Sequence, residues 1–391
     1  MRRFCILLSL FLSSVFVFAA NDVMPIIGYW GVPENNTSDE NFRVMSECGF
    51  NVSLFPYSST QALVRACRTA DKYGIKVLGK CPEMTSSPAK TANTLKHENG
   101  FFGYFMQDEP SAPEIRERQK EIERLKATDN SHCFYINLLP CSEPEKNLAA
   151  AKTRTYPEYL KTLSSTPCQQ ISFDFYPIQT SGIRETWYHT LEMVRQECIA
   201  SGKPFWGFVL SVPHAKYPQP TMGSLRLQVY ANLVYGAQAI QYFTYWTPGK
   251  NPNFNFHDAP VDTEGRKTRT YALVQEMNRE LRSVSRLFYG AKVRSVHHLG
   301  VVAQGASKLE SAPVNIRQLK ITGKNGAVIS QIEKDGHLYM AILNKDYKRD
   351  MRVDLSTLNN LPRHLTKSLK EEQMESFYIV LPGDVLLFKL R

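Results

Sequence analysis

One alternation runs through most of this chain and restricts its fold more than any other feature. A short apolar run, a polar turn and an amphipathic segment follow one another eight times. The apolar runs occupy residues 24–32, 51–57, 75–81, 103–109, 133–139, 171–177, 205–211 and 239–246. Their starts lie roughly 25–35 residues apart, which is the length of one strand–helix unit. Eight such units predict parallel strands with crossover helices, closed into a (β/α)8 TIM barrel.

Helix-boundary residues support this interpretation. The first amphipathic segment begins after the cap candidates Thr37 and Ser38 and ends at Gly49, and the second ends at Gly74. A further helix is expected at 224–237. An open doubly wound sheet is the alternative, but it calls for a glycine-rich phosphate loop after an early strand, and the first run continues as YWGVPENN.

The pattern changes near Lys292. From there the chain alternates with period two, and Asp335-Gly336 stands between two apolar runs, as in a β-hairpin. A further turn is expected at Pro382-Gly383-Asp384. We therefore expect a barrel domain at 21–291 and a small C-terminal antiparallel β-sandwich at 292–391.

The first twenty residues have the pattern of a secretory signal peptide. Arg2 and Arg3 precede an apolar run at residues 4–18, and Ala19 and Ala20 follow it. The run is shorter than the ~20 residues of a membrane span, so a retained anchor is the less favoured alternative. No later segment is long and apolar enough to span. We expect residues 1–20 to be removed and the protein to be exported, periplasmic or extracellular in a bacterium, without stable membrane insertion.

Charge and composition exclude several classes of protein. The 391 residues are 43% apolar and 21% charged, which argues against a disordered chain. The formal charge of +10 falls to +8 without Arg2 and Arg3, and the remaining charges are dispersed. No basic run or basic helix with interleaved aromatics is present, so nucleic-acid binding is not expected.

Cysteine and histidine spacing gives no metal or cofactor signature. Seven cysteines follow the signal segment, none of them in a C-x-x-C pair, and a Cys133–Cys141 disulfide is left open. His214 and His257 have no HxH or HExxH partner. We expect neither a metal nor a cofactor, and the oligomeric state is not predicted.

In a barrel of this kind the active site lies at the carboxyl ends of the strands. The residues expected there combine aromatic rings with polar side chains: Tyr29, Trp30, Asp108, Glu109, Asn137, Asp174, Tyr176, His214, Tyr242, Tyr245 and Trp246. Aromatic faces stack on the C–H faces of sugar rings while polar groups bind the hydroxyls. This combination indicates a carbohydrate ligand.

The fourth run, GYFMQDEP at 103–110, resembles the strand-four motif of the clan A (β/α)8 glycoside hydrolases, in which Asp108 here stands for an Asn. The chain is still more similar to exported sugar hydrolase-like barrels of Bacteroidetes. LRLQVYANLVYGAQAIQYFTYWTP at 225–248 and the tail segments LYMAILNKD and LPGDVLLFKL carry that resemblance. It implies Glu109 as general acid/base, with Asp108 orienting it or binding a hydroxyl.

The second carboxylate is harder to place. Clan A enzymes carry a nucleophilic Glu at the end of strand seven, but residues 203–227 contain no Asp or Glu. Asp174, at the end of strand six, is the best substitute, and Glu83 and Glu34 are weaker candidates. Carboxyls ~5–5.5 Å apart would indicate a retaining enzyme, and ~6.5–9.5 Å an inverting one.

The sequence thus predicts a secreted glycoside hydrolase that acts on an oligo- or polysaccharide through Glu109 and Asp174. The alternative is a non-catalytic glycan-binding barrel that lacks the strand-seven nucleophile. A carboxyl separation well beyond ~10 Å would favour that alternative. The sugar, the linkage and the stereochemical outcome are not predicted.

Overall fold

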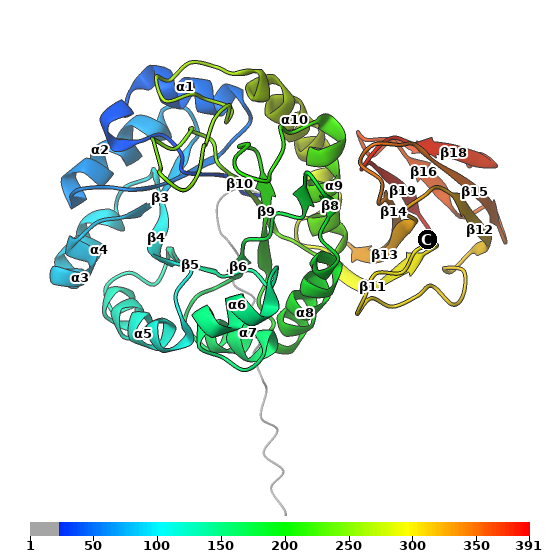
Figure 1. Cartoon of the computed structure of the whole chain (residues 1–391), viewed down its shortest axis with the longest axis horizontal. Coiled ribbons are helices and arrows are strands. Elements are labelled where there is room, and N and C mark those ends of the chain that lie inside the picture. The colour runs from blue at the N-terminus through cyan, green and yellow to red at the C-terminus, as the bar shows by residue number, and fades with distance from the viewer. Residues whose placement is uncertain (1–22) are drawn as a thin grey trace, which may run out of the picture.

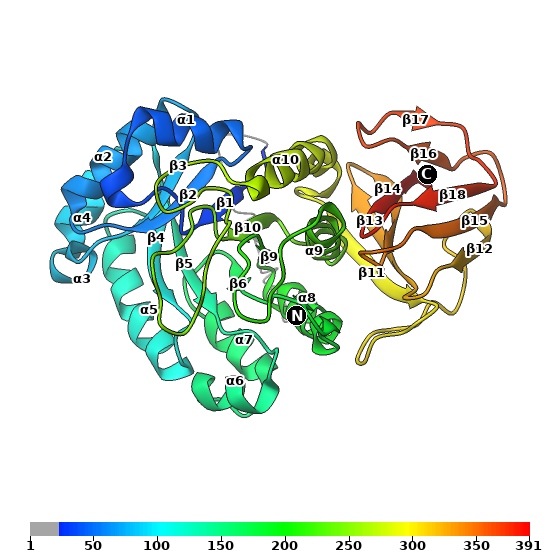
Figure 2. The same cartoon turned by 45° about the horizontal axis from the view of Figure 1, so that its top comes forward.

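The computed structural model describes residues 23–391, so the expected signal segment lies outside the described residues. Figure 1 shows a ring of helices around parallel strands, with antiparallel sheets beside it. Figure 2, turned by 45°, shows the same two parts, with the helices again outside the strands. The prediction of a (β/α)8 barrel with a C-terminal antiparallel β domain is confirmed.

Eight parallel strands close the barrel in the order β1-β10-β9-β6-β5-β4-β3-β2. They are β1 (Ile26–Tyr29), β2 (Val52–Pro56), β3 (Lys76–Lys80), β4 (Phe101–Asp108), β5 (Cys133–Leu138), β6 (Ile171–Phe173), β9 (Phe205–Leu210) and β10 (Ala239–Phe243). Each strand overlaps one expected apolar run. A small hairpin of β7 (Ile178–Gln179) and β8 (Gly182–Ile183) lies in the connection that follows β6.

The helices occupy the segments between the strands. They are η1 (Glu34–Asn36), α1 (Asp39–Glu47), α2 (Thr60–Asp71), α3 (Glu83–Ser86), α4 (Pro88–Leu95), α5 (Ala112–Lys126), α6 (Pro144–Ala151), α7 (Tyr156–Ser164), α8 (Thr186–Ser201), α9 (Met222–Val234) and α10 (Arg269–Phe288). Ser38 caps α1, because its Oγ accepts the Asn41 N–H at 3.2 Å. The helix expected from Ser224 begins two residues earlier, because Thr221 caps it.

Side chains of the barrel strands alternate between two layers. Tyr29, Tyr135 and Trp206 belong to a buried cluster that fills the barrel interior. Ile240 and Tyr242 belong to the larger cluster between the strands and the helices. The two layers explain why these strands are apolar at nearly every position.

Helix α9 is buried on every side. Of its residues from Ser224 to Val234, only Arg226 is not fully buried. One side approaches β9 so closely that a Cβ on Gly207 would lie 2.1 Å from the Asn232 Oδ1. The opposite side contacts β13 (Ala327–Lys334) and β14 (His337–Asn344) of the C-terminal part. A helix without a solvent face follows from this double coverage.

The C-terminal part consists of two sheets. The other strands are β11 (Lys292–Leu299), β12 (Ile316–Thr322), β15 (Met351–Thr357), β16 (Arg363–Leu365), β17 (Glu371–Glu372), β18 (Phe377–Val380) and β19 (Val385–Lys389). The sheet orders are β11-β13-β14-β19-β16-β17 and β12-β15-β18. Asp335 and Gly336 have φ of 49° and 77° between β13 and β14, which is the geometry of a two-residue hairpin turn. The turn at Pro382-Gly383-Asp384 joins β18 and β19, which lie in different sheets.

Polar contacts also join the two parts. The Lys367 ammonium donates to the Tyr230 hydroxyl of α9 at 3.0 Å and pairs with the Asp384 carboxylate. The Tyr235 hydroxyl lies 3.0 Å from the His298 Nε2. At Gly383 a Cβ would come within 2.2 Å of the Gly223 carbonyl oxygen, so the two backbones touch. The C-terminal sheets are thus packed directly onto the barrel.

The seven described cysteines are free thiols, so the Cys133–Cys141 pair left open by the sequence is not a disulfide here. Six of them are buried and behave as small apolar side chains. Among the helices of residues 23–391, none combines the length and the apolar character that crossing a membrane requires.

Candidate active site

Three carboxyl groups lie together at the carboxyl-terminal end of the barrel strands. Asp108 ends β4, Glu109 follows it, and Asp174 directly follows β6. The Glu109 N–H donates to the Asn137 carbonyl oxygen at 2.8 Å, which continues the pairing of β4 with β5. Asp108 and Glu109 are exposed at the mouth, and Asp174 is half-buried. The strand ends therefore present all three groups to solvent at one place.

Glu109 has a left-handed backbone, with φ of 46°. Residues other than glycine rarely adopt this conformation, because the Cβ crowds the following carbonyl oxygen. Such conformations cluster at functional sites, where the surrounding structure holds them in place. Here two features hold the turn at Glu109. Its own N–H is bonded to the Asn137 carbonyl oxygen, and Pro110 follows it with a restricted backbone.

Asn137 links the carboxyls of the two strands. Its Nδ2 donates to the Asp108 Oδ1 at 3.1 Å and to the Asp174 Oδ1 at 3.5 Å. Its own Oδ1 accepts from the Ser172 Oγ at 2.9 Å, which fixes the amide orientation. Asn137 is 2% exposed, so it acts from beneath the carboxyls.

A buried polar chain inside the barrel supports Asn137. The Ser172 Oγ accepts from the Gln241 Nε2 at 2.9 Å, and the Tyr135 hydroxyl donates to the Gln241 Oε1 at 2.8 Å. Tyr135 and Gln241 are fully buried. Buried polar groups are stable only when they are bonded, so this chain fixes the positions of the groups above it. Tyr135, Ser172 and Gln241 were not predicted, although a Ser and a Gln within apolar runs of the sequence are a visible signal.

Burial and mutual repulsion raise the pKa values of the carboxyls. For Glu109, burial among protein groups and the Asp108 charge raise the pKa from 4.5 to about 7. For Asp174, burial and the charges of Glu109 and Asp108 raise the pKa well above its ordinary value. Burial also raises the pKa of Asp108, against hydrogen bonds from Tyr29 and Asn137. No carboxyl of the three forms an ion pair within the described part of the chain.

The Glu109 and Asp174 carboxyls lie within hydrogen-bonding reach of each other, which lowers the pKa of Glu109 and raises that of Asp174. The Tyr176 hydroxyl also bonds to Asp174. Two carboxyls in contact titrate as a pair and hold one proton over a wide pH range. Since a side-chain hydrogen bond contributes to the pKa of both groups, the two carboxyls lie well within the ~10 Å that would favour a non-catalytic barrel.

The other side of the mouth is aromatic. Tyr176 stacks on Phe243 with ring centroids 5.4 Å apart, and Phe256 lies 4.7 Å from the His214 ring. His214 is buried, its Nδ1 lies 3.0 Å from the Val212 carbonyl oxygen, and burial lowers its pKa. Phe243 and Phe256 were not predicted. The sequence signal for Phe256 was the aromatic pair in NFNFHDAP after strand eight.

The prediction that Tyr242, Tyr245 and Trp246 contact a sugar is wrong, because all three are buried. Tyr242 and Tyr245 are fully buried and pack on Phe50 between strands and helices. Trp246 is 3% exposed, and its backbone N–H donates to the Trp30 carbonyl oxygen. Tyr242 faces the helices because side chains alternate along β10, whereas Tyr245 and Trp246 are buried in the loop that follows the strand.

The remaining predicted residues divide between the mouth and its surroundings. Tyr29 is buried in the barrel interior, where it bonds to Asp108. Trp30 is half-buried against Phe55 at a centroid distance of 5.1 Å. The weaker acid candidates are engaged elsewhere. Glu34 accepts from the Ser58 N–H and hydroxyl, both at 2.6 Å, and Glu83 accepts from the Thr60 N–H at 3.2 Å.

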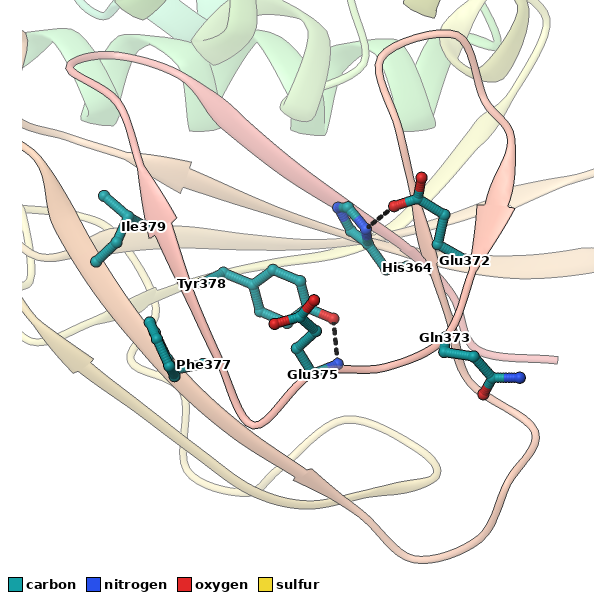
Figure 3. A pocket seen from close by; sticks show the side chains of 7 residues that line it. All are labelled: His364, Glu372, Gln373, Glu375, Phe377, Tyr378 and Ile379. Carbon is teal, nitrogen blue, oxygen red and sulfur yellow. Dashed lines mark hydrogen bonds and ion pairs between the residues drawn. The ribbon is translucent and has the colours of Figure 1, made fainter.

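No group of three or more His, Cys, Asp or Glu side chains within residues 23–391 is arranged to hold a metal ion. A separate hollow of about 500 Å³ lies in the C-terminal sheets (Figure 3). There the His364 Nδ1 lies 3.1 Å from the Glu372 carboxylate, and the Glu375 N–H donates to the Tyr378 hydroxyl. Its His364–Glu372 pair brings opposite charges together when His364 is protonated, whereas the three carboxyls of the barrel mouth form no ion pair with any described residue.

Solved structures share this fold. A GH42 β-galactosidase from G. stearothermophilus aligns over 94% of this chain and 98% of its own, with a TM-score of 0.62 and 9% identity. β-Galactosidases from Rahnella sp. R3 and Marinomonas ef1 align with TM-scores of 0.54 and 0.51 at 14% and 8% identity. Those alignments cover 71% and 66% of this chain and 58% and 60% of theirs. Nothing matches the chain among family models or curated protein sequences. These alignments show that the barrel fold is shared with β-galactosidases of known structure.

Proposed function

We propose that this protein is a glycoside hydrolase. The observation that carries the proposal is the Glu109–Asp174 pair, two interacting carboxyls at the mouth of the barrel whose pKa values are both raised. Hydrolysis of a glycosidic bond needs one protonated carboxyl for the leaving oxygen and one ionised carboxyl for water or the anomeric carbon. A pair that holds a single proton near neutral pH meets both needs.

The two carboxyls differ in their surroundings, and this supports distinct roles. Glu109 is exposed on a left-handed turn, where it can reach a leaving oxygen, and its pKa near 7 suits a general acid. Asp174 is held by Tyr176 and Asn137. Binding of a sugar between the carboxyls would break their mutual hydrogen bond, transfer the proton to Glu109 and leave Asp174 ionised.

Aromatic rings beside the pair support a saccharide substrate. Tyr176 and Phe243 form a stacked surface next to Asp174, and Phe256 extends it. Sugar rings stack on such faces. The comparison with β-galactosidases supports the class of reaction, and the conclusion here extends to O-glycosidic bonds, not to galactose.

A second candidate function is glycan binding without turnover. It rests on one observation, the absence of any Asp or Glu in residues 203–227, which span β9 and its loop. In this case the aromatic surface would bind a sugar, and the carboxyl pair would contribute only hydrogen bonds.

The test is a screen of the purified protein over aryl glycosides and oligosaccharides, followed by Glu109→Gln and Asp174→Asn. We expect turnover by the native protein and a fall in kcat/KM of about 10²–10⁴-fold for either variant. Glu117→Gln, an exposed change on α5, is the matched control and should keep full activity. Binding without turnover would favour the second candidate, and full activity of Glu109→Gln would refute the assignment.

We also propose that the enzyme acts outside the cytoplasm. The support is the pattern of residues 1–20, with two arginines, an apolar run and two alanines. The test is N-terminal sequencing of the protein from cell fractions. A mature N-terminus at residue 20 or 21 in the exported fraction is expected, and an intact Met1 would contradict export.

A further inference from the structure

A groove of about 710 Å³ lies between the barrel and the C-terminal sheets. One wall comes from the β7–β8 hairpin and the start of α8, and the other from three loops of the C-terminal part. Its lining residues are Gly182–Glu185, Tyr188, Val301–Gln304, Lys324, Asn325 and Lys345–Arg349. Figure 1 places β8 and α8 on the side of the barrel that faces these sheets. No role in the proposed chemistry has used this groove.

The groove carries an excess of positive charge. Five of its lining side chains are cationic, Arg184, Lys324, Lys345, Lys348 and Arg349, and two are acidic, Glu185 and Asp346. Lys324, Lys348 and Arg349 are exposed and form no ion pair with any described residue. The Asp346 Oδ1 is already occupied, because it accepts the backbone N–H groups of Lys348 and Arg349 at 2.9 and 3.2 Å.

Lys345 adds an independent observation. It is 5% exposed, and its ammonium donates to the Val301 carbonyl oxygen at 2.6 Å and lies 3.1 Å from the His298 Nδ1. The Tyr188 ring lies beneath it at 5.2 Å. No carboxylate of residues 23–391 forms an ion pair with it. Burial lowers the pKa of Lys345 to about 8, since a buried charge without a counter-ion is unfavourable. An anion in the groove would relieve this cost.

The groove is continuous in sequence with the candidate active site. Arg184 lies ten residues after Asp174, and its N–H donates to the Pro177 carbonyl oxygen at 2.8 Å. The segment from Asp174 to Arg184 thus carries a carboxyl of the Glu109–Asp174 pair at its start and part of the groove wall at its end. The wall residues Ile183, Val301 and Tyr347 add apolar surface beside the cations. Apolar faces next to cations match a sugar ring that bears an anionic group.

We propose that this groove binds the sulfate or carboxylate group of an anionic saccharide, so that the substrate is an acidic glycan. The saccharide part of this inference rests on the proposed function, whereas the anion part rests on the groove alone. Nucleic acid is the less suitable occupant, because phosphate backbones need several contacts along a basic stripe and the other charges of this chain are dispersed.

The first test measures binding of labelled oligosaccharides of equal length to the full protein: one sulfated, one built from uronic acids, one neutral. We expect at least one anionic oligosaccharide to bind about tenfold or more tightly than the neutral one, with affinity falling as salt rises. The two anionic probes distinguish sulfate from carboxylate. Equal affinity for all three would overturn the proposal.

The second test uses groove variants. Lys348→Gln combined with Arg349→Gln should weaken binding of the preferred anionic probe about tenfold, because each change removes a charge-assisted hydrogen bond. The matched control is Lys120→Gln combined with Arg124→Gln on α5, two exposed cations outside the groove, which should bind as the native protein does. All four changes lie on the surface, and thermal melts would verify folding. A groove variant with native affinity would overturn the proposal, and so would duplex DNA of equal charge that binds as tightly as the saccharide.

The outcome is separable from that of the proposed function. Glu109→Gln should keep its affinity for the anionic probe, since the residue lies outside the groove lining. Groove-dependent binding without turnover of any substrate would uphold the groove and refute the hydrolase. Turnover of neutral glycans without groove-dependent binding would do the reverse.

Discussion

The two sides of the barrel mouth differ in their side chains: one side is acidic and the other is aromatic. The side formed by β4 and β6 presents three carboxyls, none of them in an ion pair with a described residue. The side formed by β9 and β10 presents Phe243, Phe256 and the buried His214. On the acidic side, burial and the repulsion between neighbouring carboxylates raise the pKa values of Glu109 and Asp174, which favours their protonated forms. On the aromatic side, the buried Ser211 Oγ donates to the Thr244 carbonyl oxygen at 2.8 Å.

This difference separates chemistry from binding. In the barrels to which the strand-four motif is similar, a nucleophile comes from strand seven, on the side that is aromatic here. In the proposed mechanism the second carboxyl is Asp174, which follows β6 and lies beside Glu109. The opposite side of the mouth then carries aromatic rings on which a sugar can stack. We therefore expect changes on the acidic side to affect kcat and changes on the aromatic side to affect KM.

The largest expected effect concerns the coupling of Glu109 and Asp174. Glu109→Gln and Asp174→Asn should each lower kcat by about 10²–10⁴-fold, and the double variant should be little worse than the poorer single one, because the two groups act as a unit. Steady-state kinetics of the three variants would measure this. Additive losses would show that the two carboxyls act independently.

The next effect concerns the group beneath the carboxyls. Asn137→Ala removes the amide that donates to Asp108 and Asp174, so the pKa values of both should rise. The acidic limb of the pH–rate profile should shift to higher pH, with a loss of about tenfold in kcat/KM at neutral pH. A uniform loss of rate with an unchanged profile would instead indicate a purely structural role.

A smaller effect is expected on the aromatic side. Phe256→Ala should raise KM about tenfold and leave kcat nearly unchanged, since a lost stacking contact is worth about 1 kcal/mol. Phe254→Ala is the matched control, because that neighbouring ring is more exposed. A fall in kcat of Phe256→Ala comparable to that of Asp174→Asn would contradict the assignment of catalysis to the acidic side and binding to the aromatic side.

The smallest expected effect is on stability. The pKa of Glu109 is about 7 in the folded state against 4.5 ordinarily, so the folded state binds more protons between these values. Native stability should therefore fall as pH rises from about 4.5 to about 7, and Glu109→Gln should reduce this loss. After allowance for solvent screening, the gain at neutral pH is about 1 kcal/mol. Thermal melts across this range would measure it, and Phe256→Leu, which retains Glu109, should keep the native pH dependence.

The strand–helix rhythm and the strand-four motif predicted the barrel, its eight strands and the location of Glu109. Asp174 was also accessible, because it directly follows an apolar run. The failures concern the direction of side chains within strands. In β10, Gln241 bonds inside the barrel and Tyr242 faces the helices. Residues on both faces of the strand are buried or half-buried, so burial alone does not distinguish the two directions. A strand covered on both faces shows no polar alternation from which direction could be read.

Contacts that depend on distant segments were equally hidden. Phe256 reaches the mouth from a long loop after β10, and the chain of Tyr135, Ser172 and Gln241 connects three strands that are 37 to 106 residues apart. The expected turn at Pro382-Gly383-Asp384 is present, but tertiary packing sends the two strands that it joins to different sheets. Local pattern cannot specify pairing at this range.

The complete burial of α9 has a consequence for how this molecule can be divided. The C-terminal sheets occupy the position that solvent holds outside the other barrel helices, and Gly223 and Gly383 meet there backbone to backbone. A barrel cut at residue 291 would expose the outer face of α9, with Leu227 and Tyr230 among its residues. The C-terminal sheets therefore cover α9 as an outer layer of the barrel, and we expect a barrel without them to be less stable.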